Sequence, residues 1–82
     1  MEPAGAVYFC AMDVFERAPA GTAVTVTVRP EKATIAFEIV VESDLGTERR
    51  PPHDRVEALG GNVTVTSGGD RTIVAGSMPL DR

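Results

Sequence analysis

The chain has 82 residues, of which 43% are hydrophobic and 24% are charged, a balance typical of one small folded domain. Eight basic and twelve acidic side chains give a net charge of −4, the wrong sign for a protein that binds nucleic acid. The single cysteine cannot form an intramolecular disulfide, and the sequence has no run of about 18 apolar residues that could span a membrane. Because Met1-Glu2-Pro3 lacks the basic region of a secretory signal, we expect a cytoplasmic protein.

The first predicted element is a helix from Gly5 to Ala18, where apolar residues recur at three- and four-residue steps. Pro19 and Gly21 predict its end. Phe9 and Met12 widen the apolar stripe beyond what one sheet contact requires. We therefore expect this helix to bind a protein partner or a second copy of the chain, with a helix simply buried in a small core as the alternative.

Two strands follow the helix. Thr22–Arg29 and Thr34–Glu42 alternate apolar with polar side chains, the two-residue period of a strand with one buried face. The short link 30–33 predicts that they pair as an antiparallel hairpin. Ser43–Pro52 contains a glycine, two prolines and few apolar residues, which indicates a surface loop.

The last third of the chain predicts a short helix and a second hairpin. His53–Leu59 is the helix, and Gly60-Gly61 supplies its end. Alternating residues at 63–66, a turn at Ser67–Asp70 and a strand at Thr72–Met78 complete the pattern. The order α-β-β-α-β-β predicts an α+β two-layer sandwich, with a four-stranded antiparallel or mixed sheet covered on one face by both helices.

The apolar phase of each element predicts which side chains form the core. The sheet should contribute Val24, Val26, Val28, Ile35, Phe37, Ile39, Val63, Val65 and Ile73, and the helices should contribute Val7, Val14, Val56 and Leu59.

The end of the chain also resembles a known family. The run from Asp54 to Ser67 is similar to the stretch in which the last helix of a bacterial sensor histidine kinase ATP-binding domain passes through a double glycine into its final hairpin. Ser67–Thr72 and the closing Pro79-Leu80 continue the likeness, so that it covers the last 29 positions, Asp54 to Arg82. The resemblance implies that residues 1–82 are a single, shortened domain of the histidine kinase-like ATPase type.

An upstream segment extends the resemblance. Tyr8–Ala18 is similar to the family helix that carries a glutamate and an asparagine, and the resemblance places Asp13 at the glutamate that polarises the attacking group. It places Arg17 at the asparagine that ligates magnesium. Arginine has no acceptor atom and always carries a positive charge, so it cannot ligate the ion.

The adenine-binding segment of the family also differs here. The resemblance places Val41 at the aspartate that binds adenine, and Ser43 and Leu45 at two glycines of the same segment. Valine cannot accept the hydrogen bond from the adenine amino group, a loss of about 1–3 kcal/mol in a buried pocket. Glu42 is then the nearest acid and a weak substitute.

The phosphate-binding parts of the family are shortened. Only eight residues, Gly46 to His53, stand where the family has a long lid and a second glycine motif. Thr72 matches a family position that contacts the nucleotide. The resemblance therefore leaves Asp13 as a weak catalytic candidate, Glu42 and Thr72 as weak nucleotide contacts, and no metal ligand.

Two further residues have types that can carry chemistry. His53 is the only histidine, but the chain has no room for the helical dimer that presents a phosphoacceptor histidine in such kinases, so we expect it to begin a helix instead. Cys10 lies on the apolar stripe of the first helix and is expected to be a buried hydrophobic residue. One cysteine and one histidine form no spaced set of metal ligands.

The sequence thus favours a non-catalytic protein-interaction or regulatory domain, derived from a sensor-kinase ATP-binding domain and needing no cofactor. One alternative is the Mg-ATP-binding portion of a split or fused sensor kinase. The other is an unrelated small α+β interaction domain.

Overall fold

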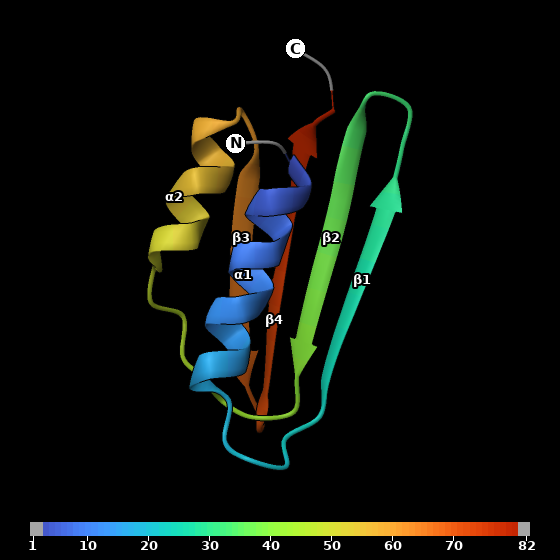
Figure 1. Cartoon of the computed structure of the whole chain (residues 1–82). Coiled ribbons are helices and arrows are strands. Elements are labelled where there is room, and N and C mark those ends of the chain that lie inside the picture. The colour runs from blue at the N-terminus through green and yellow to red at the C-terminus, as the bar shows by residue number, and fades with distance from the viewer. Residues whose placement is uncertain (1–2, 81–82) are drawn as a thin grey trace.

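The computed structural model describes residues 3–80, so Met1-Glu2 and Asp81-Arg82, which belong to the predicted amino terminus and to the end of the family-like segment, lie outside the described residues. Its elements are α1 (Pro3–Arg17), β1 (Val24–Pro30), β2 (Thr34–Val41), α2 (Pro51–Ala58), β3 (Asn62–Gly68) and β4 (Arg71–Pro79) (Figure 1). The predicted α+β class and the order α-β-β-α-β-β are confirmed.

The four strands form one open antiparallel sheet in the order β1-β2-β4-β3. The last strand therefore lies inside the sheet, between β2 and β3. Both helices lie on the same face, with α2 beside α1 on the side away from β1 (Figure 1). The other face, which we call the open face, has no helix over it in the described part of the chain.

Local sequence explains the ends of the second helix. Pro51 and Pro52 occupy its first turn, where a missing N–H costs nothing, so the helix begins before the predicted His53. Gly60 follows the helix with a φ of +89°, a conformation that a side chain disfavours. Gly61 then approaches β4 so closely that a Cβ would meet the Ser77 carbonyl oxygen and the Met78 side chain.

The core lies between the helices and the middle of the sheet. From α1 and α2 it contains Ala6, Val7, Cys10, Ala11, Val14 and Val56, and from β2 and β4 it contains Phe37, Ile39, Val41, Val74 and Met78. Val24, Ile35, Leu59, Val63 and Val65 pack at its margin. Most of the predicted core residues therefore face the helices.

Ile73 was assigned to the wrong face of the sheet. Its neighbours in the chain, Thr72 and Val74, are buried beneath the helices, and strand side chains alternate between the two faces. Ile73 instead pairs with Val40 on the open face.

Val26 and Val28 have the predicted phase but not the predicted burial. Both pair with buried residues of β2, Ile39 and Phe37, and so share the helix side of the sheet. They nevertheless stay 39% and 44% exposed, because the two helices cover β2, β4 and β3 and leave β1 uncovered.

Candidate functional site

The weak catalytic candidate, Asp13, is the centre of a charged cluster on α1. Its carboxylate accepts hydrogen bonds from Arg50, with Nε and Nη2 at 3.1 and 3.0 Å from Oδ1, and from Arg17, whose Nε lies 3.1 Å from Oδ2. The Asp13 side chain is only 10% exposed. Both of its oxygens are thus engaged by guanidinium groups, which compete with any magnesium ion that Asp13 would bind.

The two arginines join α1 to the loop that precedes α2. Arg50 comes from that loop, and its pKa is raised by its hydrogen bonds and charge attraction to Asp13. Arg17 also donates from Nη1 to the carbonyl oxygen of Leu45, at 3.3 Å. The cluster therefore joins residues 45–50 to α1. Arg17, which the resemblance aligns with a magnesium ligand, thus has a structural role here.

The nucleotide-contact candidate Thr72 is fully buried, and its hydroxyl serves within the chain both as a donor and as an acceptor. Its Oγ1 donates to the carbonyl oxygen of Ser43 at 2.7 Å and accepts from the Leu45 N–H at 2.8 Å. Ser67 Oγ lies 3.1 Å from the same oxygen. Thr72 thus attaches the loop after β2 to the start of β4, and its hydroxyl is not exposed to solvent.

The loop after β2 is closed further by Asp44. Its carboxylate accepts from the Ser67 hydroxyl and, at 3.0 Å, from the Gly46 N–H. These two hydrogen bonds, that from Ser67 first, lower the pKa of Asp44 below its ordinary value of 3.8. A short polar network therefore shapes residues 43–46 where the family has a glycine-rich turn beside adenine.

Glu42, the weak adenine-contact candidate, lies apart from this network. It is exposed and pairs with Arg71, whose Nε is 3.2 Å from Oε1. Val41, at the position of the family's aspartate, is fully buried in the core. The structure thus brings Asp13 and Thr72 to the same end of the molecule, linked through Leu45, whereas Glu42 pairs with Arg71 at the surface and Val41 lies in the core.

The remaining chemistry-bearing residues are buried. His53 is 3% exposed, and its Nδ1 accepts a hydrogen bond from the Arg50 N–H at 3.2 Å, which closes the first turn of α2. Burial, and then the charge of Arg49, lowers the pKa of His53 below 6.5, so that it is neutral at pH 7. Burial next to Asp13 raises the pKa of Cys10 to about 11, so its thiol is protonated and unreactive.

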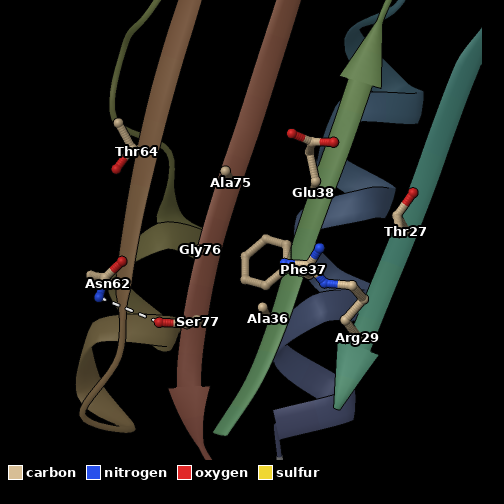
Figure 2. Close-up of a pocket in the computed structure, with 10 residues that line it drawn as sticks. All are labelled: Thr27, Arg29, Ala36, Phe37, Glu38, Asn62, Thr64, Ala75, Gly76 and Ser77. Atoms are coloured by element: carbon tan, nitrogen blue, oxygen red, sulfur yellow. Dashed lines mark hydrogen bonds between the residues drawn. The ribbon is translucent and has the colours of Figure 1, made fainter. Parts of the chain in front are cut away.

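A shallow hollow of about 360 Å³ lies on the open face of the sheet (Figure 2). Its floor consists of small residues, among them Ala36, Ala75 and Gly76, and taller side chains surround it, including Arg29, Glu38, Asn62 and Thr64. Gly76 is required there, since a Cβ would meet the Asn62 carbonyl oxygen and lie 2.9 Å from the Phe37 ring. The hollow has charges of both signs at its rim, from Arg29 and Glu38.

Sequence reasoning missed Arg50, which bonds Asp13, and Ser67, which lies beside Thr72 and donates to Asp44. One signal was available: Asp13 and Arg17 are four residues apart, the spacing of a helical ion pair. Arg50 lies 37 residues from Asp13, and nothing in the pattern of the sequence indicates that they meet.

Within residues 3–80, no three His, Cys, Asp or Glu side chains gather closely enough to hold a metal ion. Neither helix in that part of the chain has the length and apolar character needed to cross a bilayer. Comparisons with protein-family models, with curated proteins and with solved structures find no match to this chain.

Proposed function

We propose that this chain is a non-catalytic interaction or regulatory domain, working in the cytoplasm and derived from a sensor-kinase ATP-binding domain. One observation supports the proposal: the candidate residues are hydrogen-bonded to other groups of the same chain. Two arginines bond Asp13, and two backbone groups bond Thr72. A site for Mg-ATP needs such groups free to face the ligand, because a buried polar atom exchanges partners only at a cost.

The surface supports an interaction role. Four large apolar side chains on α1 and β1, namely Tyr8, Phe15, Val26 and Val28, are between 39% and 60% exposed. We call these four residues the apolar strip. Phe9, predicted as a contact residue, is 40% exposed, but Arg55 of α2 lies over its ring at 4.9 Å from the centroid, so it already has a neighbour within the chain.

Calorimetric titration with Mg-ATP tests the absence of nucleotide chemistry. We expect no binding at millimolar ATP, either by the unaltered protein or by Arg50→Gln, which removes one guanidinium from Asp13. Micromolar affinity in the unaltered protein would overturn the proposal, and binding by Arg50→Gln alone would show that the ion pair masks a working site.

Stability measurements test whether the apolar strip is needed for the fold. In dilute protein, Phe15→Ser should change the free energy of unfolding by at most about 0.5 kcal/mol, as for an ordinary surface position. Val14→Ala, one residue away and fully buried, is the control and should cost about 2–3 kcal/mol. A similar loss in Phe15→Ser would mean that the strip supports the domain itself.

A further inference from the structure

The strand β1 forms a free edge of the sheet. Among the described strands its only neighbour is β2, and neither described helix covers it (Figure 1). A free edge presents unpaired N–H and C=O groups to which another strand can pair, and proteins usually protect such edges with charges, prolines or bulges. In β1 these features are confined to the end, at Arg29 and Pro30, and the stretch from Val24 to Val28 has none.

The hydrogen bonds to β2 fix which residues face outward. The Glu42 N–H donates to the Ala23 carbonyl oxygen at 3.0 Å, and the Glu31 N–H donates to Thr34 at 2.7 Å. Because hydrogen-bonded residues alternate along an antiparallel pair, the odd-numbered residues of β1 point their backbone groups toward β2. Val24, Val26 and Val28 therefore point their N–H and C=O groups toward the free edge.

The same strand carries half of the apolar strip. Val26 and Val28 lie on the helix side of the sheet without a helix above them. The opposite edge, β3, differs: its valines, Val63 and Val65, pack against the core. Free backbone groups and exposed apolar side chains therefore coincide only at β1 among the described strands.

Tyr8 and Phe15 complete the strip from the helix. They are seven residues apart and so share one flank of α1. Phe9 and Asp13 contact α2 from the other flank, through Arg55 and Arg50. Tyr8 and Phe15 thus lie on the flank of α1 away from the residues that contact α2. The strand β1 lies on the opposite side of the molecule from α2 (Figure 1).

The sequence of the edge is symmetric about its centre. Val24-Thr25-Val26-Thr27-Val28 reads identically in both directions. Two copies related by a two-fold axis midway between their Val26 residues therefore place Val24 opposite Val28, Thr25 opposite Thr27 and Val26 opposite Val26 of the other copy. The backbone N–H and C=O groups of all three valines point toward the free edge, so each valine supplies one donor and one acceptor to the second copy. Arg29 falls opposite Ala23 of the second copy, so no like charges meet.

We propose that the apolar strip and the free edge of β1 bind a second copy of this chain, joining two sheets into one continuous eight-stranded antiparallel sheet with the two Val26 residues opposite each other across the two-fold axis. The inference rests on the proposed function, since it names the partner of that interaction domain. The valines of one copy then extend the helix-side apolar layer of the other. Since a single strand pair forms a small interface, the dimer is expected to be of micromolar strength or weaker.

Sedimentation over a range of about 10 µM to 1 mM tests the proposal, a range suited to interfaces of this size. We expect the unaltered chain to shift from monomer to dimer. Val26→Pro should stay monomeric and folded, because it removes an N–H that points out of the sheet, which edge strands tolerate. Thr27→Pro is the matched control and should lose the fold by circular dichroism, because its N–H points toward β2.

Oxidative cross-linking tests the register. Residues in a hydrogen-bonded antiparallel pair have Cα atoms about 5.5 Å apart, within disulfide range. Val26→Cys should therefore form a covalent dimer, whereas Thr27→Cys should not, since it lies opposite Thr25 of the second copy. The native thiol, Cys10, is buried and gives little background. Equal cross-linking through Thr27→Cys, or an undiminished dimer in Val26→Pro, would overturn the register.

The two proposals fail separately. A monomer at every concentration would overturn the second-copy inference. The edge of β1 would then pair with a strand of another protein or remain hydrated. If Mg-ATP still failed to bind, the non-catalytic proposal would stand. Micromolar Mg-ATP binding would overturn that proposal whatever the sedimentation result.

Discussion

The clearest test of the reasoning about the candidate site is Thr72→Val. The change keeps the shape of the side chain but removes a hydroxyl that bonds the Ser43 carbonyl oxygen at 2.7 Å and the Leu45 N–H at 2.8 Å. A neutral hydrogen bond contributes about 1 kcal/mol net, and a buried group left without a partner costs about 1–3 kcal/mol. Ser43 and Leu45 are half-buried, so water replaces part of the loss, and we expect a decrease of about 2–3 kcal/mol in the free energy of unfolding.

That decrease is large for a domain of this length, whose total stability is about 4–12 kcal/mol. Because the chain has no Trp and one Tyr, urea and thermal unfolding are best followed by circular dichroism. The midpoint temperature should fall by about 10–20 °C. Thr72→Ser keeps the hydroxyl and should lose only about 1 kcal/mol for its buried methyl group, and Thr64→Val, on the open face, should change the stability by no more than about 0.5 kcal/mol. A Thr72→Val protein as stable as the unaltered chain would refute the assignment of this hydroxyl to the loop.

Two other predictions concern buried positions. The lowered pKa of His53 means that, near pH 6.5, the unfolded chain takes up a proton that the folded chain does not, so stability should fall as the pH decreases through about 6.5. His53→Gln should flatten that slope in urea unfolding, and an unchanged slope would exclude His53 as its source. Gly76→Ala should destabilise by about 1–3 kcal/mol, because the added methyl group meets the Asn62 carbonyl oxygen and the Phe37 ring. A neutral Gly76→Ala variant would show that β3 can move away.

The parts of the fold that periodicity could predict are those with strict alternation. Val24–Val28 and Thr34–Val41 alternate, and their inward phase was predicted correctly. Ile73-Val74-Ala75 is a continuous apolar run, so the sequence gives no phase, and Ile73 was placed on the wrong face. In that strand the tight turn and the pairing with β2 decide the register, and Val74 takes the inward position.

The sequence also does not indicate where each helix lies across the sheet. The phase of Val26 and Val28 was predicted correctly, but their exposure depends on where α1 and α2 lie across the sheet. A periodic pattern gives the face of each element and not its neighbours. The same limit applies to Asp13, since its charge is read from the sequence whereas its partner Arg50 is set by how α1 and the loop before α2 meet.

The strand order β1-β2-β4-β3 has a consequence for synthesis of the chain on the ribosome. β4 is the last element made, yet it separates β2 from β3 and contributes Thr72, Val74 and Met78 to the interior. Until it emerges, the strands of the nascent chain are the β1–β2 hairpin and an unpaired β3, and two-stranded hairpins are at best marginally stable in water. The domain is therefore expected to fold only after release of its final strand, and a nascent chain arrested before Arg71 should remain sensitive to protease along its whole length.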